Sequence, residues 1–156
     1  MRAGPWSRYV GGVTDPRTAI AALVFAYAER LDAGDLGGVS ALFARATFRS
    51  AAAPERVLRG TAQVRRMLDP VLLYDGVPRT RHVLTNLQID VAGSEARSRC
   101  DFTVLQATDG FPLQPILAGR YRDAFVRSDD AWWFADRLVL PDLVGDLRHH
   151  YRIAAR

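Results

Sequence analysis

The strongest constraint on the fold is a change of hydrophobic period about halfway along the chain. In the first half, apolar residues recur at helical spacing, as in the stretch from Ile20 to Leu31. After residue 80 they alternate with polar residues in four long segments, 81–91, 95–107, 116–127 and 132–140. Short turns between adjacent segments favour antiparallel pairing. This order predicts an α+β fold in which three N-terminal helices pack on an antiparallel sheet.

Local signals place the helices more closely. Asp15 can cap the first helix and Pro16 suits its first position, while Gly34 ends it. Asp35 and Thr61 are expected to cap a second and a third helix, and two short strands are expected at 46–50 and 56–59. A final short helix is possible after Pro141. Because long strands twist and coil, the sheet should curl strongly and form a cone-shaped barrel with an internal pocket.

Composition limits the classes of function. A chain of 156 residues fits one domain, expected over 15–156, with a flexible arm at 1–14. All 21 basic residues are arginines, spread among acidic residues without a basic block, so nucleic-acid binding is not expected. No apolar run reaches the roughly 20 residues that a membrane span needs, and no secretory signal is evident. With one cysteine, Cys100, we expect a cytoplasmic protein.

One histidine lies where acid–base chemistry would be useful. On strict alternation, His82, Leu84 and Asn86 share one face of the segment 81–91 and would enter the pocket. The other face carries Val83, Leu87, Ile89 and Val91 and is apolar enough to be covered, for example by a second subunit. A histidine can take and return a proton near neutral pH, especially when a carboxylate orients it. Asp32 is a plausible partner if the end of the first helix lies over this strand.

The order of several short motifs resembles that of SnoaL-like proteins of the nuclear transport factor 2-like superfamily. The motifs are YAERLDAGD, ALF, GTAQVRRML, TRHVLTN and RYRDAFVRSDDAWWFADR, over about residues 17–140. The chain is most similar to the branch that holds scytalone dehydratase and hexachlorocyclohexane dehydrochlorinase. That resemblance implies a cone-shaped barrel and a homodimer through the outer sheet face. It also implies cofactor-independent proton transfer by His82, oriented by Asp32.

The resemblance implies a cyclase, dehydratase or isomerase that acts on an apolar small molecule such as a polyketide intermediate of secondary metabolism. Asn86 would be a polar contact, and the pocket wall is expected to include Tyr27, Phe48, Phe102 and Trp132. The sequence also departs from scytalone dehydratase: Leu31 stands where that enzyme has a tyrosine. No second pocket histidine is evident on 95–107 or 116–127. Dehydration of that enzyme's own substrate is therefore not expected.

A second constellation resembles limonene epoxide hydrolase and related polyether cyclases. Arg99 and Asp101 lie two residues apart on one strand, and Asp136 follows on the last strand. In those enzymes two carboxyl groups linked by an arginine open an epoxide, which requires separated pKa values. These residues can equally form a structural ion pair. A third interpretation is a domain that only binds a ligand or partner. Adjacent His149 and His150 diverge on a helix, so no metal site is expected.

Overall fold

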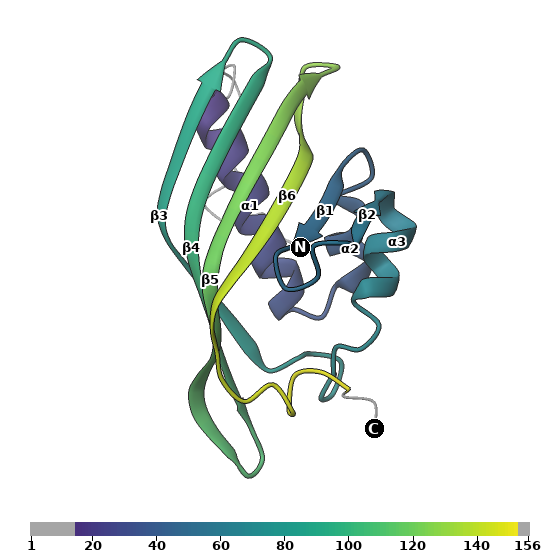
Figure 1. The fold of residues 1–156 in the computed structure, drawn as a ribbon, viewed down its shortest axis with the longest axis vertical. Helices are drawn as coiled ribbons and strands as arrows, with labels where there is room; N and C mark the ends of the chain where they lie inside the picture. The colour runs from purple at the N-terminus through teal and green to yellow at the C-terminus, as the bar shows by residue number, and fades with distance from the viewer. Residues whose placement is uncertain (1–14, 153–156) are drawn as a thin grey trace, which may run out of the picture.

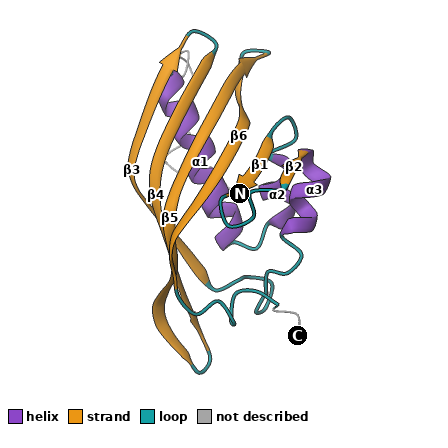
Figure 2. Ribbon diagram, in the orientation of Figure 1, coloured by secondary structure: helices purple, strands orange, loops and turns teal. Residues whose placement is uncertain are grey.

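The structure, a computed structural model, describes residues 15–152. The N-terminal arm expected at 1–14 lies outside this range. The elements follow the expected order (Figures 1 and 2): α1 (Pro16–Asp32), α2 (Leu36–Ala41), β1 (Thr47–Ser50), β2 (Val57–Arg59), α3 (Gly60–Met67), β3 (Thr80–Ala92), β4 (Glu95–Thr108), β5 (Phe111–Ser128) and β6 (Ala131–Val144). The prediction of an α+β fold with helices before the long strands is confirmed.

The six strands form one curved sheet in the order β2-β1-β6-β5-β4-β3. The neighbours pair antiparallel except β1 and β6, which run parallel. The sheet is therefore mixed, because β1 enters beside the last strand before the chain reaches the long hairpins. It is also open, with β2 and β3 at its edges, so the cone is a curled sheet closed by helices.

Helix α1 crosses one face of the long strands, which is the inner face of the sheet (Figure 1). Asp15 caps it by accepting a hydrogen bond from the Thr18 N–H at 3.1 Å, and Pro16 occupies the first turn, as expected. Its buried residues, Ile20, Val24, Tyr27, Ala28 and Leu31, form the stripe that covers the sheet. No helix within residues 15–152 is long and apolar enough to cross a membrane.

Two local predictions are wrong. Helix α3 begins at Gly60 rather than after a Thr61 cap, and its first turn is held by Gln63, whose side chain accepts from the Arg59 N–H at 2.9 Å. The tail does not form a helix within 15–152. Instead β6 continues past Pro141 to Val144, because its partner β5 is long enough to keep pairing as far as Leu117. The chain then turns back, and Tyr151 makes a bridge to Val71.

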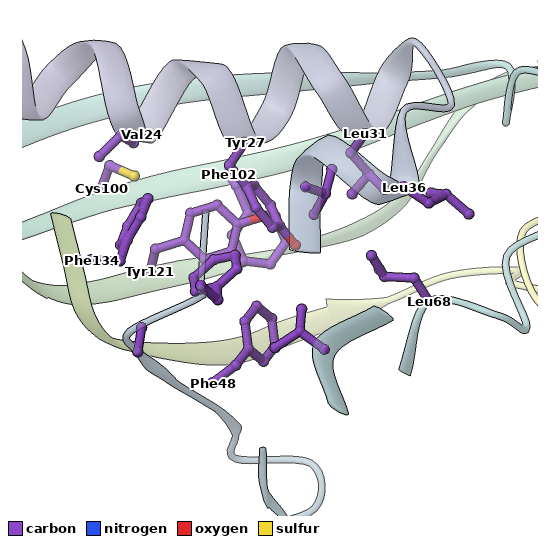
Figure 3. Close-up of a cluster of buried hydrophobic side chains, with 14 of the residues drawn as sticks. Val24, Tyr27, Leu31, Leu36, Phe48, Leu68, Cys100, Phe102, Tyr121 and Phe134 are labelled. Atoms are coloured by element: carbon purple, nitrogen blue, oxygen red, sulfur yellow. The ribbon is translucent and has the colours of Figure 1, made fainter. Parts of the chain in front are cut away.

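The core lies between α1 and the inner face of the sheet and continues beneath α2 and α3. Figure 3 shows Tyr27, Leu31, Phe48, Phe102, Tyr121 and Phe134 converging on this space from helices and strands. Aromatic rings contact one another edge-on or stacked, with Phe102 and Tyr121 stacked at 4.3 Å between centroids. Such pairs stabilise the fold by more than their buried area alone accounts for. The packing fixes α1 relative to β3, which sets the position of the site described below.

A β-bulge in β3 overturns the expected distribution of its side chains. Asn86 adopts a left-handed backbone with φ of 54°, and the pairing with β4 shifts between Thr85 and Gln88. Alternation therefore resets by one residue. Leu87, with Ile89 and Val91, joins His82 on the inner face and packs against the core, while Asn86 turns outward. The expected apolar outer face of this strand is consequently polar beyond Val83.

The bulge gives a first testable prediction. Asn86→Val is expected to lower the free energy of unfolding by about 1–2 kcal/mol relative to Asn86→Gly, because a β-branched residue resists the left-handed region that glycine adopts freely. Both variants lose the same side-chain hydrogen bond, so the difference isolates the backbone. Denaturant unfolding of the two proteins measures it. Equal stabilities would mean that the bulge is not fixed by this conformation.

Candidate active site

His82 and Asp32 meet where the C-terminal end of α1 lies over the start of β3. The Nδ1 atom of His82 is 2.6 Å from Oδ1 of Asp32. The backbone N–H of His82 donates to Oδ2 of Asp32 at 2.8 Å, and the Thr80 hydroxyl donates to Oδ1 at 2.8 Å. The His82 side chain is only 4% exposed. The structure thus brings together the two residues that the sequence singled out.

These contacts define how the pair is protonated. Burial alone would raise the pKa of Asp32, but hydrogen bonds from His82 and Thr80 outweigh it and lower that pKa below its usual value. The carboxylate is therefore ionised at neutral pH and can only accept hydrogen bonds. Since it faces Nδ1, the neutral imidazole must carry its proton on Nδ1. The lone pair on Nε2 is then available to remove a proton from another molecule.

A cavity of about 380 Å³ opens beside His82. Its wall is mostly aliphatic and aromatic, and it includes three of the four residues expected there: Tyr27, Phe48 and Phe102. Trp132 is buried elsewhere, opposite Arg127 near the β5–β6 turn, so the expectation that it lines the pocket is wrong. On its other side the pair of Asp32 and His82 borders an open groove of about 470 Å³ between α1 and β3.

Asn86 does not share the cavity with His82. Its amide donates to Oδ2 of Asp101 at 2.6 Å on the outer face of the sheet. Because the bulge reverses the alternation, a residue four positions after His82 points away from it. The expectation that Asn86 contacts the ligand beside His82 is therefore wrong.

The second expected constellation also lies on the outer face, in an open cleft of about 800 Å³. Arg99 does not link the two carboxylates there: it donates to Gln88, at 2.6 Å and 3.0 Å. Asp136 is held instead by Arg49 and Thr47. The sheet separates Asp101, Arg99 and Asp136 from the cavity, so the two expected sets do not occupy one chamber.

A buried ion pair that the sequence reasoning missed lies behind the cavity. Arg137 donates to both carboxylate oxygens of Asp123, at 2.8 Å and 2.7 Å, and neither side chain is exposed. The guanidinium lies over the rings of Tyr27 and Tyr121, each 4.3 Å from its centroid. It thereby braces two aromatic side chains that form the cavity wall. Asp123 lies on the same face of β5 as the buried Tyr121 and Phe125. The alternation along this strand could therefore have indicated that Asp123 is buried.

A second histidine also enters the cavity, again unexpected from the sequence. His150 comes from the segment after β6, is 3% exposed and lines the same space as His82. Burial, together with the nearby His82, lowers the pKa of His150 to about 4, against an opposing effect of Asp32. The imidazole is therefore neutral at pH 7. No local pattern indicates that His150 is buried, because contact between the tail and the core depends on tertiary folding.

A curled sheet crossed by one long helix, with a histidine–carboxylate pair at an apolar cavity, makes this an α+β cone. An NTF2-like protein from Novosphingobium aromaticivorans has a similar fold, with a TM-score of 0.69 and 22% identity over 80% of each chain. The chain belongs to the SnoaL-like domain family, whose model matches residues 13–138.

Two further solved structures are similar. A candidate scytalone dehydratase from Novosphingobium aromaticivorans is 25% identical, with a TM-score of 0.67 and 89% of each chain covered. LinA is 19% identical, with a TM-score of 0.65 and 90% of each chain covered, and this likeness concerns the fold. No curated protein is significantly similar in sequence. The expected resemblance to this family and branch is confirmed.

Proposed function

We propose that the protein is a cofactor-independent acid–base enzyme, a lyase or isomerase of the cyclase and dehydratase type, acting on an apolar small molecule. The observation that carries the proposal is the hydrogen bond between His82 and Asp32 at the wall of an apolar cavity. Asp32 fixes the tautomer that leaves Nε2 of His82 unprotonated. The family adds support, because the similar structures include a candidate scytalone dehydratase.

In the proposed reaction Nε2 of His82 removes a proton from a carbon or a hydroxyl group of the bound molecule. The imidazolium that forms is stabilised by the ionised Asp32, and it returns the proton to the leaving group or to another position. Elimination, isomerisation and ring closure all begin with this step. The cavity volume of about 380 Å³ lies within the range of small-molecule sites and suits a compact ring system, such as a polyketide-type intermediate.

The test uses a nitrobenzisoxazole, a small apolar compound whose ring opens to a coloured cyanonitrophenolate when one carbon-bound proton is removed. The wild-type protein is expected to accelerate this reaction, and His82→Gln is expected to lose about 100-fold or more, the size of a general base contribution. Absorbance of the product measures the rate. Ligand-free thermal unfolding checks that the variant is folded.

A matched control separates the alternatives. Asp101→Asn removes a carboxylate from the outer cleft and is expected to retain the wild-type rate. The reverse result, activity lost in Asp101→Asn and kept in His82→Gln, would favour chemistry at the outer carboxylates. If the wild-type protein does not accelerate the reaction, or if neither variant changes it, the proposal of an acid–base enzyme is wrong and a binding domain is favoured.

A further inference from the structure

His150 is held in the cavity wall by hydrogen bonds of its own backbone and of the residues beside it in the sequence. Its carbonyl accepts from the Leu72 N–H at 2.9 Å, and the next residue but one, Arg152, donates to the Pro70 carbonyl at 2.8 Å. The carbonyl of His149 accepts from Tyr74 and from Gln106, each at 2.9 Å. These bonds hold the backbone of the segment against the loop before β3 and against β4, so the place of His150 in the cavity wall is set before any ligand binds.

The two ring nitrogens of His150 have different surroundings. Nδ1 is buried and has no hydrogen-bond partner among residues 15–152. A buried N–H without an acceptor is rare in proteins, whereas an unpaired acceptor is tolerated more often. The neutral ring is therefore best accommodated with its proton on Nε2. Because the residue lines the cavity, this N–H is a donor available to a ligand.

The cavity wall thus carries two imidazoles whose unpaired nitrogens can play opposite roles. His82, with its proton on Nδ1, offers a lone pair, while His150 offers an N–H. Together they suit a carbonyl compound with an acidic C–H next to the carbonyl group. His82 would accept the proton, and His150 would donate a hydrogen bond to the carbonyl oxygen. A neutral imidazole is an effective donor to a developing oxyanion, since it does not simply transfer its proton.

We propose that His150 binds the carbonyl oxygen of the substrate and stabilises the enolate formed when His82 removes the adjacent proton. The substrate class is a small, largely apolar ketone. The C–H electron pair becomes the C=C bond of the enolate, the carbonyl π pair moves to oxygen, and the proton resides on Nε2 of His82. Return of a proton to the same or another carbon completes exchange or isomerisation. This inference rests on the proposed function of His82.

The experiment follows deuterium incorporation into β-tetralone, an apolar bicyclic ketone, by proton NMR in heavy water. The wild-type protein is expected to accelerate exchange next to the carbonyl. His150→Phe keeps a ring but removes the donor, and is expected to slow exchange about 100-fold, as the loss of one oxyanion donor does. His150→Gln retains an N–H and should recover part of the rate. If His150→Phe does not fold, the comparison of His150→Gln with the wild type remains: a reduction of about tenfold is expected, and an unchanged rate would overturn the assignment.

The matched control is the neighbouring histidine. The ring of His149 stacks on Phe111 outside the cavity, so His149→Phe is expected to exchange β-tetralone at the wild-type rate. Nitrobenzisoxazole opening should change only about threefold in His150→Phe, because the nitrophenolate disperses its own charge. Unchanged ketone exchange in His150→Phe, or none in the wild type, would overturn the ketone assignment. The proposed function of His82 would still hold if nitrobenzisoxazole opening depends on His82.

Discussion

Asp32→Asn is expected to slow nitrobenzisoxazole opening by about 100-fold or more, nearly as far as removal of His82 itself. A side-chain amide has one acceptor oxygen, and its nitrogen can only donate, whereas both carboxylate oxygens accept from the His82 backbone, the His82 ring and Thr80. If the amide oxygen satisfies the His82 backbone N–H, the amide NH₂ faces Nδ1. The ring must then carry its proton on Nε2, which is the wrong nitrogen for a base facing the cavity.

The measurement is the rate of product formation at saturating and subsaturating nitrobenzisoxazole. The loss should fall on kcat, because the cavity wall is unchanged. Asp32→Asn combined with His82→Gln should be no slower than His82→Gln alone, since the two residues act as one unit. Asp136→Asn, which alters a carboxylate with comparable partners on the outer face, is the control and should be silent. A rate within about threefold of wild type in Asp32→Asn would contradict the role given to Asp32.

Arg137→Met is expected to lower the free energy of unfolding by about 3–5 kcal/mol. The substitution leaves the Asp123 carboxylate fully buried without the two hydrogen bonds that now satisfy it. It also removes a guanidinium that lies over Tyr27, Tyr121 and Phe134. An uncompensated buried charge accounts for most of the expected loss.

Denaturant unfolding measures this effect, and two further proteins identify its cause. Arg137→Met combined with Asp123→Leu removes both charges and should recover much of the stability, since an apolar replacement of a buried pair is often nearly neutral. Arg49→Met breaks a partly exposed pair with Asp136 and should cost about 1 kcal/mol or less. If the double variant is as unstable as Arg137→Met, packing of the arginine rather than the stranded charge is responsible.

The sequence predicted most of the architecture because its strongest signals are local. The cap at Asp15, the proline at Pro16 and the helical spacing up to Leu31 lie within one helix, and α1 forms where they indicate. The four long strands follow from alternation and turns in the same way. The face assignment failed after Asn86, because one residue in a left-handed conformation reverses every later side chain. A strand pattern by itself does not reveal such a bulge.

In the candidate site, too, the features that depend on contacts between distant residues could not be predicted from local sequence patterns. Contact between Asp32 and His82 joins residues fifty positions apart, and only the resemblance to a family predicted it. The burial of Arg137 and of His150 was not predicted, and the physical reason is common to both. Burial of Arg137 depends on Asp123 on the neighbouring strand, and burial of His150 depends on the loop before β3. Neither partner is near in sequence.

The family model ends at residue 138, but the cavity does not. Pro141, Val144, Leu147, His150 and Tyr151 all contribute to its wall and all follow that boundary. The residues that the family model matches therefore include Asp32 and His82, whereas part of the cavity wall comes from residues that follow the match. Substitutions between Pro141 and Tyr151 are therefore expected to change which molecule the cavity accepts without disturbing Asp32 or His82. Replacing this segment with that of a relative is expected to alter ligand selectivity while Asp32 and His82 stay in place.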